Sequence, residues 1–407
     1  MFPFRIAWLA AVLGAASVPV HALTLAQALD AAQGHAPELA ASAAATAAAQ
    51  ALTRSAGALP DPKLSIWIDD LPTEGDDAYR IGSAKRAFSL MQEVPNAGLR
   101  AAERRIADAR LQGSEAQARY ARLGVTRDTT LAWLALYYLD RKAALLDAQE
   151  AEIRRGEAAA LARLKGGDSA DGALAARLER AQLDDARDEL ARDRLRAQAQ
   201  LARWVGTEAA AQPVSGELPD WLGADAPAGD DLLAEQPEIR AAATLLDGAQ
   251  AELAMAQAAK RPNWGVELGW GLDAMDQGMA MLKFTFELPI FAASRQDPKI
   301  AAAYANVRQR DAERETRLAD YRRQIAETRA EQAALRAQLD RLNTRTLPLI
   351  EQQAALALAR LRAAAADGNA VLDARKARLA AQWRGVTLEA DLADATARLH
   401  FLTGAHP

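Results

Sequence analysis

The chain has 407 residues, no cysteine and a formal net charge of -5 at pH 7. The lack of cysteine excludes disulfides, thiolate metal sites, a cysteine nucleophile and a lipid-modified N-terminal cysteine. The mildly acidic balance lacks the basic patch of a nucleic-acid-binding protein, so we expect no nucleic-acid partner. Only 5% of the residues are aromatic and alanine is abundant, a composition typical of long helices that pack side by side.

Residues 1–22 are predicted to be a secretory signal peptide. Arg5 precedes a short apolar run, and Val20-His21-Ala22 fits the small-x-Ala cleavage pattern, so the mature chain is expected to begin near Leu23. The alternative is a membrane anchor, but the run is too short and has the wrong flanks. Charged residues interrupt every later apolar run. A membrane-inserted part would therefore have to consist of strands in a closed barrel.

The first half of the mature chain is predicted to combine helices with one strand pair. Pro60 and Pro62 end the first helix, and Pro95 ends the strand pair. The predicted elements, in chain order, are a helix at 23–58, strands at 63–69 and 85–94, a long helix at 99–164, a break at 166–169 and a helix that ends near 205.

The second half repeats this plan after a loop or linker at 207–229 rich in Pro, Gly and Ala. The predicted elements are a helix at 237–261, strands at 263–272 and 279–288, a long helix at 292–366 with a possible kink at Pro348, a break at 367–369 and a final helix to 402. Four landmarks recur at nearly constant spacing, which indicates an internal duplication. They pair Pro37 with Pro237, Pro60 with Pro262, Pro95 with Pro289 and Gly206 with Gly404, so we divide the chain into repeats at 23–206 and 230–404.

Both strand pairs alternate in polarity, the second more regularly than the first. Strands of about ten residues are long enough to cross a bilayer when tilted. The alternative is a pair of soluble hairpins packed on helices. The predicted lipid-facing side chains of the second pair are Trp264, Val266, Leu268, Trp270, Leu282, Phe284, Phe286 and Leu288.

Four strands cannot close a pore, whereas three copies would supply a closed barrel with an even number of strands. A helix of about 70 residues is about 100 Å long, so its apolar stripe must pack laterally in a coiled coil or helix array. The alternative is an ordinary antiparallel bundle. If three copies close the barrel, the assembly is a homotrimer.

No pattern for catalysis, a cofactor or a tight metal site is present. The four histidines form no i, i+4 pair and no His-x-x-Glu-His motif, and no glycine-rich phosphate loop occurs. Carboxylates that lie close in sequence fall on charge-dense helices and are typical of a solvated face. We predict that the chain is not an enzyme.

The first half of the mature chain contains five distinctive motifs. They are Leu-Thr-Leu-Ala-Gln-Ala-Leu at 23–29, Pro-Glu-Leu at 37–39, Gly-Ala-Leu-Pro-Asp-Pro-Lys-Leu at 57–64, Ile-Asp-Asp-Leu-Pro at 68–72 and Gln-Glu-Val-Pro-Asn-Ala at 92–97. These motifs resemble the TolC-type outer-membrane efflux proteins, and within them the CzcC-like heavy-metal branch. The resemblance covers essentially the whole mature chain. It implies an α+β membrane protein with four strands per protomer in a trimeric twelve-stranded outer-membrane barrel and a long periplasmic helical barrel. It also implies a periplasmic adaptor and a proton-driven inner-membrane pump of the resistance-nodulation-division type as partners, with divalent heavy-metal cations as the exported substrate.

The two helix breaks resemble the periplasmic hairpin tips of the family. The resemblance implies an entrance ring of carboxylates at Asp367 or Asp373. The alternative is a solvated turn, with Asp373 in the first turn of its helix, where a carboxylate is favoured in any case. The predicted adaptor-contacting residues are Gly166, Gly167, Asp168, Ser169, Asp171, Gly368, Asn369 and Leu372.

Two other functions stay open at this stage. The same fold serves drug efflux and protein secretion, and only the branch motifs favour metal ions. A periplasmic coiled-coil adaptor or scaffold would be an interaction protein of another class. That alternative predicts a single helical hairpin flanked by soluble β-domains, which the duplicated strand pairs disfavour.

Overall fold

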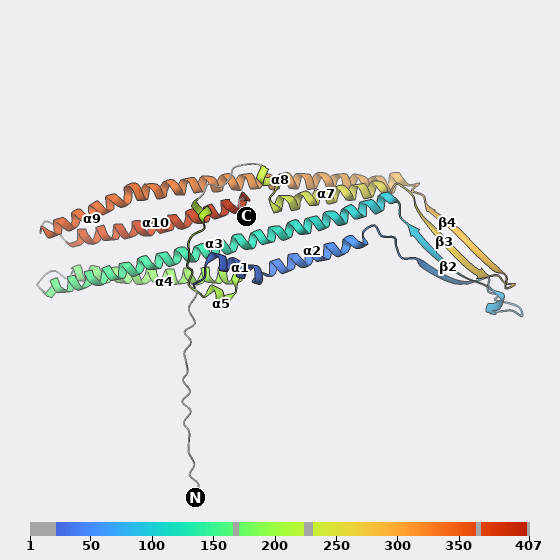
Figure 1. Cartoon of the computed structure of the whole chain (residues 1–407), viewed down its shortest axis with the longest axis horizontal. Coiled ribbons are helices and arrows are strands. Elements are labelled where there is room, and N and C mark those ends of the chain that lie inside the picture. Colours follow the sequence, from blue (N-terminus) through green and yellow to red (C-terminus); the bar gives the residue numbers. More distant parts are fainter. Residues whose placement is uncertain (1–21, 166–170, 224–230, 364–367, 405–407) are drawn as a thin grey trace, which may run out of the picture. The chain divides into compact units, whose positions relative to one another are not determined.

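A computed structural model describes residues 22–165, 171–223, 231–363 and 368–404 (Figure 1). The chain divides into two compact units, and each takes segments from both repeats. The hairpin unit comprises Met1–His35, Thr129–Leu218 and Arg345–Ala390. The strand unit comprises Ala36–Asp128, Pro219–Thr344 and Asp391–Pro407. The predicted signal peptide lies almost entirely outside the described residues.

The strand unit contains one antiparallel sheet with the strand order β1-β2-β3-β4. Its strands are β1 (Lys63–Asp69), β2 (Lys85–Val94), β3 (Asn263–Leu272) and β4 (Gly278–Glu287), and the short 3-10 helix η1 (Ile81–Ser83) lies between β1 and β2. The first three strands have the predicted bounds. The prediction for β4 was wrong by one residue at each end, so Leu288 lies just outside the strand. Asn263 pairs with Glu287, and Pro262 before it cannot extend the ladder.

Four helices of the strand unit follow one another side by side in the order α2, α3, α7, α8 (Figure 1). They are α2 (Pro37–Ser55), the first part of α3 (Ala97–Lys165), α7 (Pro237–Ala258) and α8 (Ala292–Arg341), while the short α6 (Asp231–Ala234) precedes α7. The contacts that set this order join Thr46 Oγ1 to the Ser114 carbonyl at 3.4 Å, Gly113 to Thr244, and Asn306 Nδ2 to Glu252 at 3.2 Å. The row of helices, like the sheet, therefore has two open ends.

The first predicted helix is interrupted and forms two helices. α1 (Leu25–His35) ends one residue before α2, and Ala36 between them is extended, with φ -68° and ψ 114°. Proline disfavours helical backbone at the residue before it, and Pro37 is tolerated at the helix start because the first amides have no partner within the helix. The prediction of one continuous helix at 23–58 was therefore wrong.

The hairpin unit is built from α1, the second part of α3, α4 (Asp171–Val205), α5 (Thr207–Ala210), α9 (Leu347–Arg362) and most of α10 (Gly368–Leu402). Trp133 is fully buried and its indole Nε1 donates to the Leu23 carbonyl at 2.9 Å. Leu146, Ile153 and Leu183 form a second apolar cluster. These buried side chains position the helical hairpins.

The linker is not a structureless loop in its described part. Gly206 ends α4 with φ +86°, a conformation that favours glycine, and α5 follows at once. Val214 forms a parallel bridge to Leu23, and the 3-10 helix η2 (Asp220–Gly223) comes next. Residues 207–223 of the predicted loop or linker therefore contain two short helices and pair with the backbone of Leu23.

The long helix of the second repeat changes geometry just before Pro348, where the sequence indicated a kink. A π-helical turn, η3 (Leu342–Thr346), separates α8 from α9. Proline lacks an amide proton and crowds the carbonyl four residues earlier, so a wider turn relieves that contact.

Among the described residues, no helix is long and apolar enough to cross a membrane.

Candidate functional site

One face of the four-stranded sheet is apolar from β1 to β4. Leu268 and Phe286 on this face are each 60% exposed. Only Gln92 and Arg86 interrupt the apolar rows that cross the central strands. The rows run Ile66–Phe88–Trp270, Leu64–Leu90–Leu268–Leu282, Val266–Phe284 and Val94–Trp264–Phe286. Seven of the eight predicted lipid-facing residues therefore share this face within β3 and β4; the eighth, Leu288, follows β4.

Aromatic side chains occupy both ends of the apolar face. Phe88 and Trp270 contact each other near the turn end, with ring centroids 6.1 Å apart. Trp264 pairs with Phe286 near the helix end. Trp264 and Trp270 are separated by about 20 Å along the strand, at roughly 3.4 Å per residue. Aromatic girdles spaced in this way flank the apolar band of membrane-spanning strands.

The opposite face carries mainly polar and small side chains, together with Trp67 and three methionines. Glu267 accepts hydrogen bonds from Ser89 Oγ at 2.6 Å and from Lys283 Nζ at 3.2 Å. Lys63 pairs with Glu93 at 2.5 Å across β1 and β2. The rows on this face are Ser65–Ser89–Gly269–Met281, Trp67–Ala87–Gly271–Met279, Lys63–Met91–Glu267–Lys283 and Glu93–Gly265–Thr285. Its charges are balanced by cross-strand pairs, so the face can line an aqueous channel.

Gly271 on the polar face is required by close strand approach. A Cβ at this position would lie 2.5 Å from the Arg86 carbonyl oxygen and 2.6 Å from Ala87 Cβ. Neither atom belongs to the end of a flexible side chain. The sequence showed Gly271 as one member of an alternating pattern but gave no sign of this contact.

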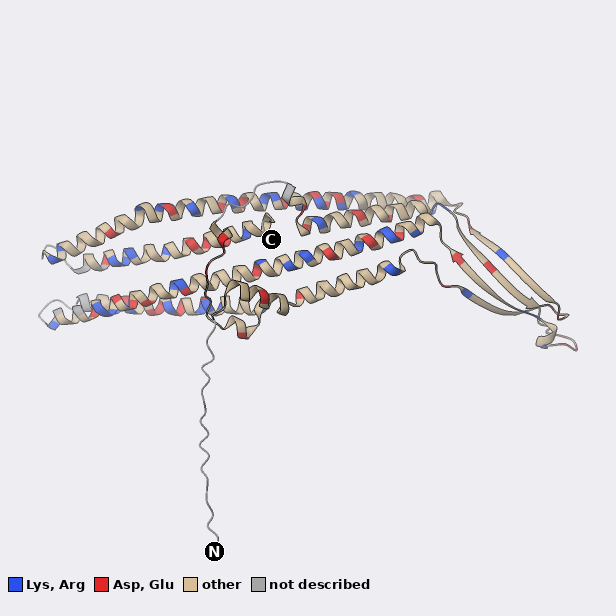
Figure 2. Ribbon diagram, viewed as in Figure 1, with Lys and Arg blue, Asp and Glu red and all other residues tan. Residues whose placement is uncertain are grey.

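The two end helices of the strand unit expose alanine-rich faces. α2 has no buried residue and carries no charge between Glu38 and Arg54, and Figure 2 shows it almost entirely uncharged beside the charge-rich long helices. Helix spacing places exposed alanines on one side of each helix, namely Ala44, Ala48 and Ala51 on α2 and Ala301, Ala305 and Ala312 on α8. An uncharged helix with so little burial needs a further partner.

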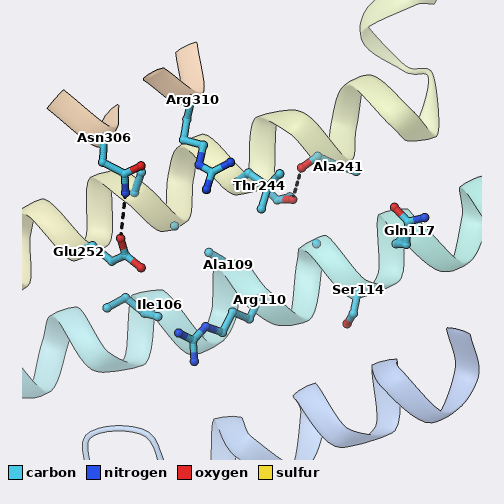
Figure 3. Close-up of a pocket in the computed structure, with 14 residues that line it drawn as sticks. Ile106, Ala109, Arg110, Ser114, Gln117, Ala241, Thr244, Glu252, Asn306 and Arg310 are labelled. Atoms are coloured by element: carbon cyan, nitrogen blue, oxygen red, sulfur yellow. Dashed lines mark hydrogen bonds between the residues drawn. The ribbon is translucent and has the colours of Figure 1, made fainter. Parts of the chain in front are cut away.

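A cavity of about 350 Å³ lies between α3, α7 and α8 (Figure 3). Gly113 of α3 and Gly248 of α7 line this cavity, and glycine has no side chain that could fill it. Arg110 and Arg310 reach its edge, and Arg310 pairs with Glu313 at 2.9 Å. The lining holds no arrangement of nucleophile, base and acid, so we assign it no chemistry. No motif in the sequence indicated this cavity.

The predicted tip residues fall largely outside the described residues. Gly166, Gly167, Asp168, Ser169 and Asp367 are not described. Asp171 opens α4, while Gly368, Asn369 and Leu372 lie in the first turns of α10. Asp373 is exposed and is the sixth residue of α10, so its placement in the first turn was wrong.

Ion pairs join α10 to α3 and α4 in the hairpin unit. Arg378 lies 2.7 Å from Glu152, and Lys376 lies 3.7 Å from Glu179. Arg141 also pairs with Glu389, and Lys142 lies over the Trp383 ring at 5.2 Å.

Burial perturbs two ionisable groups of α3 in this unit. Burial, assisted by the nearby Glu389 carboxylate and opposed by Arg141, raises the pKa of Tyr138 to about 12. Burial also raises the pKa of Asp140 despite the nearby Arg194 guanidinium. Both groups pack within a helix assembly and neither lies in the cavity of the strand unit, so these shifts reflect packing.

The part of the chain that the structure describes holds no group of three or more His, Cys, Asp or Glu side chains placed to bind a metal ion.

The fold, with long helices and four strands per chain, is that of the TolC-like outer-membrane channels. Residues 228–405 match the sequence model of the family described as outer membrane efflux protein. The prediction that the chain is not an enzyme agrees with this match to an efflux protein family. No curated protein matches the chain in sequence.

Several solved structures share this fold. A membrane protein from Pseudomonas aeruginosa is 20% identical, with a TM-score of 0.80 and 93% of both chains covered. The outer membrane protein VceC from Vibrio cholerae is also 20% identical, with a TM-score of 0.77 and coverage of 93% of this chain and 96% of that chain. The Campylobacter jejuni CmeC outer membrane channel is 15% identical, with a TM-score of 0.77 and coverage of 93% and 85%.

Proposed function

We propose that the chain is one protomer of a trimeric outer-membrane duct that exports substrate delivered by an inner-membrane pump and a periplasmic adaptor. The observation that carries this proposal is the exposed apolar face that runs across all four strands, opposite a face of balanced polarity. Such a sheet is stable with lipid on one side and water on the other. The match to the efflux protein family supports the same function.

The two unpaired edges of the sheet, and the helices next to them in the chain, support the trimer. β1 and β4 each leave one edge of the sheet without a partner strand, which lipid does not tolerate. α2 directly precedes β1 in the chain, and α8 directly follows β4. One copy's β1 and α2 can therefore meet the next copy's β4 and α8 in a single continuous interface. Three copies then close a barrel of twelve strands.

The helix breaks are proposed to form the periplasmic tips. The tip at 362–373 is the better candidate for the entrance, with Asp367 or Asp373 contributing to a carboxylate ring that attracts cations. The tip near 166–169 and the tip at 362–373 would both contact the adaptor. Residues 1–22 would direct export to the periplasm and then be removed.

Heavy-metal cations are proposed as the exported substrate, on the strength of the branch-like motifs at 57–64 and 92–97. A strain that lacks this gene should become sensitive to cobalt, zinc or cadmium salts, and the intact gene should restore resistance. Increased sensitivity to organic drugs with unchanged metal tolerance would favour the drug-efflux alternative.

The duct is tested with one substitution on each sheet face. The full chain should reach the outer membrane as a heat-resistant trimer and conduct ions in planar bilayers. Phe284→Lys places a charge on the apolar face and should prevent trimer insertion, since a lysine facing lipid costs about 2–4 kcal/mol at the midplane. Thr285→Lys, one residue later on the polar face, is the matched control and should insert normally. A soluble periplasmic wild-type protein would instead support the adaptor alternative.

A further inference from the structure

Methionine is concentrated on the polar face of the sheet. The chain has six methionines, and Met91, Met279 and Met281 all lie on this face in the registered sheet. Met279 is 59% exposed, whereas Met91 and Met281 are half-buried. This arrangement adds three thioethers to a surface that would face the lumen of the duct.

Glycines of β3 allow two of these side chains to lie flat on the sheet. Met91 Cε is 3.2 Å from the position that a Cβ of Gly265 would occupy. Met281 Cε is 3.1 Å from the corresponding position at Gly269. The two methyl groups therefore lie against the backbone of β3.

Met279 and Met281 are the pair best placed to share a ligand. Both side chains leave β4 on the same face, about 7 Å apart at the backbone. Methionine has three rotatable bonds and a polarizable sulfur, so two sulfur atoms can converge on one ion over this distance. Met91 lies two strands away, beside Glu267, and belongs to a separate contact.

The neighbouring charges leave few ligands for hard cations on this face. Glu267 is already held by Lys283 and Ser89, and Glu93 is held by Lys63. Thioethers are neutral at every relevant pH and select soft ions such as Cu(I) and Ag(I) over hard divalent ions. The available donors on this surface are therefore soft ones.

We propose that Met279 and Met281 form a thioether site for soft monovalent cations, Cu(I) or Ag(I), on the lumenal face of the sheet. Its role in transit rests on the proposed duct function, whereas binding itself does not. Neutral ligands hold an ion weakly enough to release it, which conduction requires. The site would add thiophilic monovalent cations to the divalent metal cations proposed above as exported substrates.

The test titrates the purified full-length protein in detergent with silver nitrate in chloride-free buffer and follows the heat by calorimetry. Wild-type protein should show saturable binding, and the Met279→Leu/Met281→Leu variant should bind about tenfold or more weakly, because leucine keeps the bulk and removes both sulfur ligands. Met255→Leu on α7 is the matched control and should bind as the wild type does. Zinc sulfate should give no saturable heat at this site.

Absence of saturable silver binding in the wild type would overturn the proposal, as would binding that survives in the double variant. Heat resistance of the oligomer shows whether the double variant is folded, and Met281→Leu alone, expected to weaken binding, provides a milder second variant. Bilayer conductance of the wild type separates the two proposals. A conducting trimer that binds no silver would refute only the site, whereas a silver-binding protein that does not conduct would refute only the duct.

Discussion

Arg378 on α10 lies 2.7 Å from the carboxylate of Glu152 on α3, and this ion pair connects the two repeats within the hairpin unit. Lys376 on the same helix lies 3.7 Å from Glu179 on α4. Both pairs are partly exposed, so each contributes only about 0.2–1 kcal/mol to stability. Their proposed role is to hold α10 against α3 and α4.

We predict that Arg378→Glu raises the bilayer conductance of the proposed duct, because two carboxylates then repel across α3 and α10. The exchanged pair, Glu152→Arg with Arg378→Glu, should restore the wild-type conductance, and a double-mutant cycle on thermal unfolding should give a coupling energy below about 1 kcal/mol. Equal conductance for the wild type and both variants would contradict a role for this pair in opening.

The close strand contact at Gly271 gives a second prediction. Gly271→Ala should destabilise the sheet by about 1–3 kcal/mol, since the new Cβ would overlap the Arg86 carbonyl oxygen and Ala87. The measurement is the temperature at which the oligomer dissociates on a gel. Gly278→Ala is the matched control, because its Cβ would meet nothing closer than Trp270 Nε1 at 3.7 Å. Equal dissociation temperatures would refute the contact.

Alkaline unfolding should depend on Tyr138. Burial raises the pKa of Tyr138 from its ordinary value near 10 to about 12. The unfolded chain therefore releases this proton first as the pH rises, and the Tyr138 contribution to stability is complete below pH 10 and lost between pH 10 and about 12. Tyr138→Phe should reduce the fall in thermal midpoint over this interval. Tyr79→Phe, at a tyrosine that is 71% exposed, is the control and should leave the profile unchanged.

The proposed interface between copies can be tested by cross-linking, since the chain has no cysteine of its own. Within the chain, Thr244 on α7 contacts Gly113 on α3. Ala44 takes the place of Thr244 when Pro37 is aligned with Pro237. Ala312 lies one residue beyond the place of Gly113 when Gly206 is aligned with Gly404. The duplication therefore predicts that Ala44 of one copy lies near Ala312 of the next.

The Ala44→Cys/Ala312→Cys variant, treated with a short bifunctional maleimide, should give covalent dimers and trimers. Each single variant is a control and should give neither species, because the two positions lie on different helices of the interface. A folded double variant that remains monomeric under cross-linking would contradict the pairing of α2 with α8 between copies.

The periodicity of the sequence was enough to predict most of the helices and strands of this protein and the apolar face of the sheet. Alternation of side chains in β3 and β4 predicted the apolar face, because strand geometry alone sends residues 264, 266, 268 and 270 to one side. Prolines and glycines predicted where the strands end, because they restrict or change the local backbone conformation. Their recurrence also predicted the second repeat. The extended backbone at Ala36 was not predicted, although a proline at position 37 disfavours helical backbone at the residue before it.

Only the tertiary structure decided features that join residues distant in sequence. The β2–β3 register pairs Met91 with Glu267 and lets Ser89 donate a hydrogen bond to the Glu267 carboxylate, and no local rule relates residues so distant in sequence. The same holds for Gly271, whose need for a glycine comes from the neighbouring strand, and for the parallel bridge between Leu23 and Val214 that orders the linker. Local backbone preferences set the elements, whereas packing between the repeats set which side chains meet.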